Sequence, residues 1–317
     1  MPELIMDALQ SVGLRVDSGL IALNSYENRV YQFLDEDKKR YVVKFYRPER
    51  WSPEQILEEH ELSLELDAAE IPVVPPLRID GSTLLAHQGF RYAVFPSVGG
   101  RQFEQDNDEQ LEWVGRFIGR IHRSNGEKCF RFRPTIALEE YLYEPRRELE
   151  LSTLITGKQK AAFLNAVDLL IAEVKLHWNE DWRPLRLHGD LHASNILWRD
   201  GPMFVDLDDA RNGPAVQDLW MLLNGDRNEQ QYQLSILLDA YSEFMDFNPR
   251  ELALIEPLRA MRMIYYLAWV SRRWGDPAFP HSFPWMLDTG FWEQQISIFT
   301  EQVKLLREPP LQLMPSY

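Results

Sequence analysis

The residues best suited to chemistry lie in the segment 187–198, where polar side chains are framed by apolar ones. Asp190 precedes Asn195 by five positions, which is the spacing of a kinase catalytic loop. In that loop the aspartate accepts the proton of the substrate hydroxyl, and the asparagine holds a magnesium ion. Asp206 follows the apolar run 203–205, so a strand ending there would place a second hard oxygen ligand beside Asn195. The pattern predicts phosphoryl transfer from ATP, with Asp190 and Asp206 catalytic and Mg²⁺ held by Asn195 and Asp206.

Two histidines, His188 and His192, alternate with Asp190 in the same segment. Alternating histidine and aspartate side chains also resemble the ligand set of a zinc or di-metal hydrolase. Zinc would need one or two further ligands downstream, and the only later histidine is His281, inside a proline-rich run. A metal-dependent hydrolase therefore stays as an alternative, disfavoured by the missing ligands.

A kinase also needs groups that hold the nucleotide, and the N-terminal part offers three of them in the right order. A strand lysine must bind the α- and β-phosphates, a helix glutamate must pair with it, and a turn must cover the phosphates. Lys44 lies in the apolar run 41–46, where strand alternation places it on the face opposite Val43. Glu59 and the polar loop 24–28 occupy the other two positions.

A helix that carries Glu59 is well marked in the sequence. Ser52 is a suitable N-cap, Pro53 suits the first helical position, and Gln55 completes a capping box. We expect this helix to end at residues 71–72 and to turn Glu59 inward. Its other acidic residues follow helical spacing and are expected to form an outer acidic stripe: Glu54, Glu58, Glu61 and Glu65.

The period of the apolar residues changes along the chain. Strand patterns dominate up to residue 95, including short candidates at 77–79 and 84–85, and the turn-rich segment 96–100 follows. Beyond it the patterns are mostly helical, starting with an apolar face over 111–121 in which Gly115 and Gly119 allow close packing. This predicts an α+β protein with two lobes: residues 1–97, an antiparallel sheet plus helix that binds nucleotide, and residues 98–317, a mostly helical catalytic and substrate lobe.

Composition limits the possible partners. The chain has 317 residues, and its 49 acidic against 34 basic residues give a net charge of −15. Such a surface disfavours nucleic acid and anionic membranes as partners. A single cysteine, Cys129, excludes a disulfide framework, and no apolar run reads as a secretory signal or a membrane span. We therefore expect a cytoplasmic protein.

Several segments of the sequence resemble those of a known family. Segments 187–197, 204–210, 213–214 and 218–219 resemble the aminoglycoside phosphotransferase and homoserine or choline kinase superfamily of protein-kinase-like folds. Segments 23–31, 42–51 and 95–101 look like a bacterial serine/threonine protein kinase family within it, and the likeness extends from about residue 5 to residue 310. The resemblance implies a bilobal protein-kinase-like fold, ATP and Mg²⁺ as cofactors, a protein substrate and a place in a stress response. It implies these roles: Asp190 as base, Asn195 and Asp206 as magnesium ligands, Ser25 as a phosphate-loop contact to ATP, Lys44 with Glu59 as the nucleotide anchor, and Asp208 as an accessory carboxylate.

Some features depart from ordinary protein kinases. The phosphate loop has no glycine-rich motif, and Gly189 stands where an arginine usually precedes the catalytic aspartate. Only eleven residues separate Asp206 from Asp218, which leaves no room for a long activation segment. Switching by activation-loop phosphorylation is therefore disfavoured.

The phosphoryl acceptor cannot be read from these motifs. The same loop signature serves a small-molecule kinase that phosphorylates an amino alcohol, a sugar or an aminoglycoside. An acidic helical lobe would suit a cationic acceptor of that kind. A non-catalytic ATP-sensing module is a further alternative, which the set of Lys44, Asp190, Asn195 and Asp206 argues against.

Overall fold

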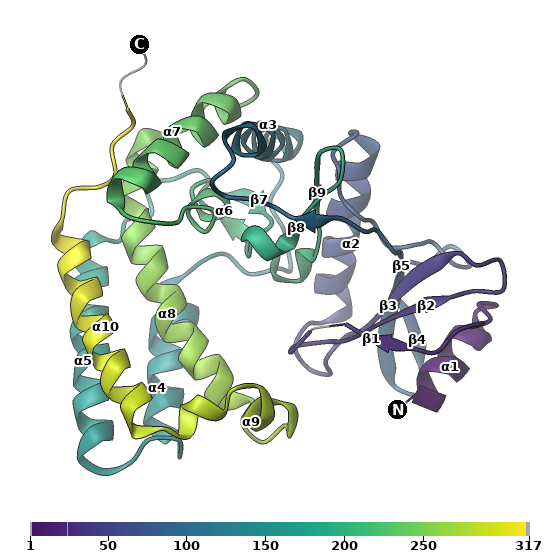
Figure 1. Ribbon diagram of the computed structural model, residues 1–317, viewed down its shortest axis with the longest axis horizontal. Coiled ribbons are helices and arrows are strands. Elements are labelled where there is room, and N and C mark those ends of the chain that lie inside the picture. Colours follow the sequence, from purple (N-terminus) through teal and green to yellow (C-terminus); the bar gives the residue numbers. More distant parts are fainter. Residues whose placement is uncertain (1, 24, 315–317) are drawn as a thin grey trace. The chain divides into compact units, whose positions relative to one another are not determined.

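The computed structural model describes residues 2–23 and 25–314 (Figure 1). Asn24, the first residue of the predicted phosphate loop, lies outside the described residues. The chain divides by its contacts into two compact units, each built from separate stretches of sequence: unit 1 is Met1–Pro134, Arg186–Arg211 and Ile236–Asp246, and unit 2 is Thr135–Leu185, Asn212–Ser235 and Phe247–Tyr317. The lobe boundary predicted between residues 97 and 98 separates two continuous stretches of sequence, whereas each unit combines several stretches. That boundary therefore stays a prediction.

Unit 1 contains a five-stranded antiparallel sheet with the strand order β1-β2-β3-β5-β4 (Figure 1). Its strands are β1 (Ile21–Ala22), β2 (Arg29–Leu34), β3 (Arg40–Phe45), β4 (Leu85–His87) and β5 (Phe90–Pro96). Lys44 of β3 lies opposite Val30 on one side and Ala93 on the other. The antiparallel start predicted from the sequence is confirmed, but segment 77–79 forms no strand and makes only an isolated bridge from Ile79 to Ser82.

The two faces of the sheet are covered by different helices, and successive side chains of a strand point to opposite faces. Helix α1 (Pro2–Ser11) packs its buried face against Val43 and Phe45 of β3, in one apolar cluster. Ile56 of helix α2 (Pro53–Ala68) packs instead with Ala93, the strand partner of Lys44. Because neighbouring residues of a strand face opposite sides, Lys44 points toward α2, as the apolar alternation predicts.

Helix α2 begins as expected and ends earlier than expected. Ser52 caps it, and the reciprocal capping box with Gln55 is present. Its last residue is Ala68 rather than a residue at 71–72, because Glu70 adopts the left-handed region, with φ of 56°. Glu59 is buried, as predicted. The outer stripe is only partly solvated, since Glu58 and Glu65 accept hydrogen bonds from other segments of unit 1.

The rest of unit 1 holds a second small sheet and a helix. They are β6 (Arg101–Gln102), α3 (Asp108–Ser124), β8 (Ile196–Trp198) and β9 (Pro202–Phe204), with 3₁₀ turns at Ala193–Asn195 and Leu207–Asp209. Gly115 and Gly119 of α3 lie against the backbone of Leu237 and Tyr241, and a Cβ on either glycine would come within 2.5 Å of a carbonyl oxygen. The close approach predicted for these glycines is confirmed.

Unit 2 is helical, as predicted for the C-terminal part. Its elements are a π-helical turn (Glu139–Tyr143), α4 (Glu144–Leu151), α5 (Gly157–His177), α6 (Gln217–Trp220), a 3₁₀ helix (Pro249–Leu254), α8 (Ile255–Arg272), α9 (Ala278–Ser282), a 3₁₀ turn (Pro284–Leu287) and α10 (Thr289–Arg307). Strands β7 (Leu185–Leu187) and β10 (Arg211–Gly213) and helix α7 (Arg227–Ser242) contain residues of both units. Phe163 of α5 packs edge-on against Trp292 of α10. The mixed sheet and helix content confirms the α+β class.

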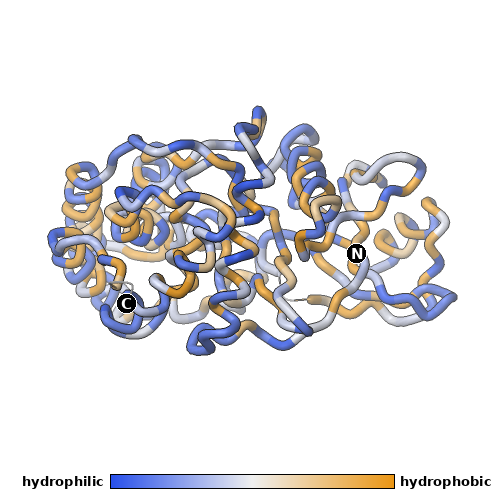
Figure 2. The backbone as a smooth tube through the Cα atoms, turned by 90° about the horizontal axis from the view of Figure 1, so that it is seen from above, coloured by the Kyte–Doolittle hydropathy of each residue, from blue (hydrophilic) through white to orange (hydrophobic). Residues whose placement is uncertain are grey.

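Hydrophobic and hydrophilic residues alternate over short distances along the backbone of the described residues (Figure 2). Among residues 2–23 and 25–314, no helix combines the length and the apolar character that crossing a bilayer requires.

Candidate active site

A tight hairpin brings two of the predicted site residues together. Strands β8 and β9 pair antiparallel, and the Val205 amide donates to the Asn195 carbonyl at 3.0 Å. Asn195 immediately precedes this hairpin and Asp206 lies two residues after it, so both lie at its open end. Asp206 takes a left-handed backbone, with φ of 62° and ψ of 65°, and its side chain is 56% exposed. The strand end predicted before Asp206 is therefore the second arm of a hairpin.

Lys44 joins the sheet and α2 to this hairpin. Its Nζ lies 3.6 Å from Glu59 Oε1 and 3.4 Å from Asp206 Oδ1. The shortest contact is to a third carboxylate, since Lys44 Nζ is 2.8 Å from Asp208 Oδ1. The structure thus brings Lys44, Glu59 and Asp206 together, and it adds Asp208 as the carboxylate nearest to the lysine.

Asp208 is the centre of a buried charge cluster. Its other carboxylate oxygen accepts hydrogen bonds from Arg50 and, at 3.1 Å, from the Asn28 side chain. Arg50 also binds Asp209 at 2.8 Å. The Asp208 side chain is 5% exposed, so these cations and the amide replace the water that a carboxylate would otherwise bind.

Burial and neighbouring charges shift the pKa values of Lys44, Asp208 and Glu59 in this cluster. Burial works against the ammonium of Lys44, yet the carboxylates of Asp208, Glu59 and Asp206 outweigh it and raise the pKa of Lys44 well above its usual value. Burial likewise opposes ionisation of Asp208, but Lys44, Arg50 and Arg133 hold its pKa below the ordinary range. The pKa of Glu59 is raised, because burial outweighs the attraction of Lys44 and Arg133. The lysine and Asp208 are therefore both charged at neutral pH.

Asp190 lies in the segment between β7 and the hairpin. The Asn195 side-chain amide donates to the Asp190 carbonyl at 2.9 Å, which ties the two ends of the five-residue spacing together. The side chain of Asp190 is 24% exposed, and one of its oxygens is 3.4 Å from His192 Nε2. His188 Nε2 donates instead to the Val205 carbonyl at 2.9 Å. Since the two histidines serve different partners, they do not form the converging ligand set that the hydrolase alternative needs.

The oxygen donors of Asn195 and Asp206 suit a magnesium ion. The amide nitrogen of Asn195 is engaged with Asp190, so its Oδ1 is oriented away from that contact and can act as a ligand. Asp206 is the most exposed carboxylate around Lys44 and offers a second hard oxygen. The part of the chain that the structure describes contains no group of three or more His, Cys, Asp and Glu side chains placed to hold a metal. Two protein oxygens completed by phosphate and water match the way Mg²⁺ is usually bound beside nucleotides.

Hydrogen bonds hold residues 25–28 of the predicted phosphate loop, which contains no glycine. The Asn28 amide donates to Ser25 Oγ at 3.3 Å, which closes the turn over Ser25. Arg47 donates to the carbonyls of Tyr26, at 3.1 Å, and Glu27, at 2.9 Å, and its own amide donates to the side chain of Asn28. Residues 26–28 of the loop are thus held by the side chain and the backbone amide of Arg47, in the segment after β3.

Backbone conformation and steric crowding explain why a glycine occupies position 189. Its φ is +85°, and a Cβ there would stand 2.2 Å from the Asp209 carbonyl oxygen. A left-handed backbone costs a non-glycine residue about 1–2 kcal/mol, and overpacking adds about 1–3 kcal/mol. An arginine at this position, as in ordinary protein kinases, would not fit.

We predict that Gly189→Ala lowers the free energy of unfolding by about 2–5 kcal/mol, the combined backbone and steric cost. The matched control is Gly81→Ala, because Gly81 has φ of +83° with nothing within 4 Å of its Cβ position. It should lose only the backbone part, about 1–2 kcal/mol. Urea denaturation of both variants measures the difference, and equal losses would contradict the steric explanation.

The profile of the family described as "Phosphotransferase enzyme family" matches residues 20–255. The chain belongs to the phosphotransferase enzyme family. Stress response kinase A of Escherichia coli (strain K12) is 64% identical over 316 residues, which cover 100% of this chain and 96% of that protein. Serine/threonine protein kinase RdoA of Salmonella typhimurium (strain LT2) is 62% identical, with the same coverage.

Solved phosphotransferase structures share the fold. An amicoumacin kinase, solved in complex with AMP-PNP and Ca²⁺, aligns with a TM-score of 0.74 at 19% identity and covers 97% of this chain and 94% of that one. A microcompartment-associated aminopropanol kinase aligns with a TM-score of 0.71 at 17% identity and covers 96% of each chain. The protein is therefore a phosphotransferase enzyme with the kinase-like fold predicted from its sequence.

A buried histidine of α2 lies beside the candidate site. His60 of α2 shares hydrogen bonds with the Tyr46 hydroxyl, at 2.7 Å, and with Thr83 Oγ1, at 2.9 Å. Burial, followed by the charges of Lys44 and Arg133, lowers the pKa of His60 from 6.5 to about 3. A protonated His60 is thus strongly disfavoured in the folded protein.

We predict a pH-dependent stability that His60 causes. Below pH 6.5 the unfolded chain binds a proton at His60 that the folded chain does not bind, so stability falls as the pH falls toward 3. Between pH 7.5 and pH 5 this loss amounts to about 2 kcal/mol. His60→Gln should remove that part of the pH dependence in urea denaturation, whereas His281→Gln, at an exposed position, should leave it unchanged. Identical pH slopes for wild type and His60→Gln would refute the assignment.

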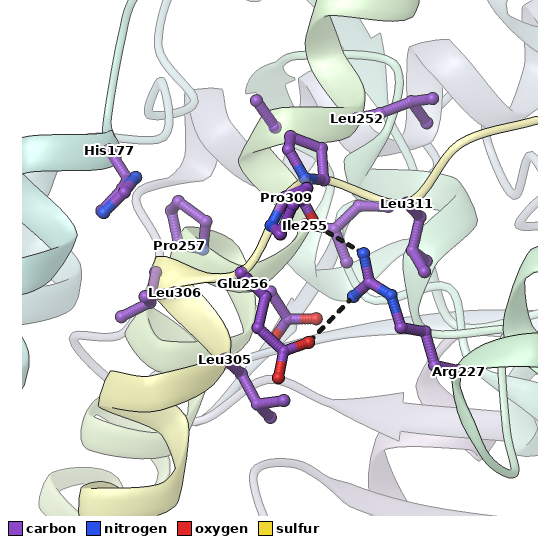
Figure 3. A pocket seen from close by; sticks show the side chains of 13 residues that line it. His177, Arg227, Leu252, Ile255, Glu256, Pro257, Leu305, Leu306, Pro309 and Leu311 are labelled. Atoms are coloured by element: carbon purple, nitrogen blue, oxygen red, sulfur yellow. Dashed lines mark hydrogen bonds and ion pairs between the residues drawn. The ribbon is translucent and has the colours of Figure 1, made fainter.

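A separate small cavity lies in unit 2, among residues that the site does not use (Figure 3). Arg227 spans it, donating to the Pro309 carbonyl and approaching Glu308 at 3.5 Å. Its volume is about 60 Å³. Ligand sites usually measure about 300–1,000 Å³, so this cavity is too small for a nucleotide.

Proposed function

We propose that this phosphotransferase is an ATP- and Mg²⁺-dependent serine/threonine protein kinase that acts in a stress response in the cytoplasm. The observation that carries the proposal is the meeting of Lys44 with Glu59 and Asp206, at 3.6 Å and 3.4 Å. A nucleotide lysine, its helix glutamate and a metal aspartate have to meet in this way in a kinase. The name of the 62% identical serine/threonine protein kinase supports a protein hydroxyl as acceptor.

Lys44 and Ser25 would hold the nucleotide. The charge of Lys44 is directed by Glu59 on one side and by Asp208 on the other, so its ammonium has a fixed place from which to bind the α- and β-phosphates. The Ser25 hydroxyl accepts a hydrogen bond from the Asn28 amide, and its own proton can then be donated to a phosphate oxygen. Charge-assisted contacts of this kind position the phosphates without requiring flexible glycines.

Asn195 and Asp206 would hold the metal, and Asp190 would act as the base. Bound magnesium would neutralise the charge on the β- and γ-phosphates. Asp190 would orient the acceptor hydroxyl and take its proton as the hydroxyl oxygen forms its bond to the γ-phosphorus. The bond from that phosphorus to the β,γ-bridging oxygen breaks, and ADP leaves. The partial exposure of Asp190 and its fixed backbone, bonded to Asn195, support this role.

A small-molecule kinase is the second candidate. The two solved structures named above are an amicoumacin kinase and an aminopropanol kinase, and they share the fold at 17–19% identity. The net charge of −15 would favour a cationic acceptor of that class. The same residues would hold ATP and the metal in either case, so only the acceptor differs.

Incubation of the purified protein with γ-labelled ATP and Mg²⁺ tests the proposal. One set of reactions contains generic protein acceptors, and a parallel set contains amino alcohols, sugars and aminoglycosides. We expect label on serine or threonine of protein. Label confined to a small molecule would establish the second candidate, and no transfer to any acceptor would count against both.

A further inference from the structure

Arg133 is the most completely enclosed charged side chain of the site, with 0% of it exposed. Its Nη2 lies 3.0 Å from Glu59 Oε2, so the glutamate that faces Lys44 is held from its other side by an arginine. This partner could not be predicted from local sequence patterns, because Arg133 lies 74 residues after Glu59.

The other nitrogens of Arg133 bind the backbone around Asp208. Nη1 donates to the Asp208 carbonyl at 2.8 Å and to the Ala210 carbonyl at 2.9 Å. Nε donates to the Gln55 carbonyl in the first turn of α2, at 2.7 Å. One guanidinium therefore joins α2, its glutamate and the segment that follows Asp206.

The backbone that carries Arg133 is itself fastened to α2. The amides of Arg131, Phe132 and Arg133 donate to the Glu58 carboxylate, at 2.7 Å, 2.9 Å and 2.8 Å. The Gln55 side chain donates to the Phe132 carbonyl at 2.9 Å. The backbone of Arg133 is therefore fixed relative to α2. A residue that positions another side chain needs such a fixed backbone.

We propose that Arg133 is a positioning residue that keeps Glu59 and the segment after Asp206 assembled around Lys44. The inference rests on the proposed kinase function and names a further residue on which that same site depends. In kinases that are switched, the lysine–glutamate pair and the metal aspartate are brought into place by an activation segment. Here only eleven residues follow Asp206 before Asp218, and Arg133 supplies the connection instead.

The first test compares Arg133→Gln and Arg133→Lys with the wild type. Arg133→Gln should lower kcat at least tenfold and change the KM for ATP less than threefold, because phosphates are still bound but are not held in line. Arg133→Lys, which keeps the cation for Glu59, should restore part of kcat. Arg131→Gln is the matched control, since Arg131 is exposed and its backbone bond to Glu58 is retained. Equal loss in the glutamine and lysine variants, or a loss confined to KM, would overturn the proposal.

The second test does not depend on activity and guards against misfolding. Hydrogen–deuterium exchange should rise in α2 and in residues 204–211 of Arg133→Gln, while α10 of unit 2 stays protected. Glu58→Gln, which loosens the backbone around Arg133 without removing it, should raise exchange in the same two segments to a smaller extent. Exchange that rises evenly over the chain, or in neither segment, would show that Arg133 does not position these elements. If the wild type transfers no phosphate but the local pattern is found, the proposed function fails and the positioning contact stands.

Discussion

Replacing Asp190 with asparagine is expected to lower kcat by about 10³–10⁴-fold, with little change in the KM for ATP. A positioned general base contributes about 10²–10⁴-fold, and loss of the carboxylate also removes an orienting acceptor for the substrate hydroxyl. Asparagine keeps the shape of the side chain, and the contact from Asn195 goes to the Asp190 backbone, so the fold should persist. Single-turnover transfer from γ-labelled ATP measures the rate, and circular dichroism checks the fold.

Asp200→Asn is the control for this experiment. Asp200 lies in the β8–β9 turn, is exposed, and has φ of 57°, a backbone that asparagine tolerates. The same chemical change at this distance from the reacting atoms should leave kcat within about twofold of the wild type, as expected for an exposed position. If Asp190→Asn retains wild-type transfer, Asp190 is not the base and the catalytic-loop interpretation is wrong.

The local part of the site could be predicted from the sequence. The five-residue spacing of Asp190 and Asn195, and the apolar run before Asp206, are short-range signals that a single hairpin converts into proximity. Strand alternation likewise placed Lys44 on the face toward α2, and helical spacing turned Glu59 inward. Periodicity reports which face a residue occupies, and these predictions needed nothing more.

The partners of the buried charges could not be predicted in this way. Arg50, Asn28 and Arg133 meet Asp208 or Glu59 from segments whose own spacing shows no periodic pattern. Nothing in a local sequence states which distant cation neutralises a buried acid. The one available signal was the burial of Glu59 itself, because a buried carboxylate requires cations or donors nearby. That requirement exceeds the single charge of Lys44, which also serves Asp206 and Asp208.

Among the predicted site residues, Asp208 differs most between the role expected from the sequence and its place in the structure. From the sequence it has a lesser claim than Asp206, as an accessory carboxylate. In the structure it is the shortest contact of Lys44 and is buried beneath Arg50 and Asn28. Asp206, in contrast, is largely exposed and makes the longer contact. In the proposed mechanism the two aspartates therefore have different tasks: the exposed Asp206 would bind the metal, and the buried Asp208 would fix the position of Lys44.

Asp208→Asn is expected to lower the free energy of unfolding of the nucleotide-free protein by about 3–5 kcal/mol, the usual cost of removing one partner of a buried ion pair. Asparagine keeps the size of the side chain, but Lys44 and Arg50 lose their shared anion. Urea denaturation at pH 7 without metal measures this loss, and phosphotransfer should fall at least tenfold because Lys44 is no longer fixed.

The sign of that stability change separates two roles for Asp208. If it were chiefly a metal ligand repelled by Asp206, removing its charge would relieve the repulsion and stabilise the metal-free protein. If it sets Lys44, the same change destabilises the protein whether or not metal is present. The double variant Lys44→Met with Asp208→Asn should lose less than the sum of the single variants by about 1–3 kcal/mol, because neither charge is then left without the other. Additive losses would mean that the 2.8 Å contact contributes nothing to stability.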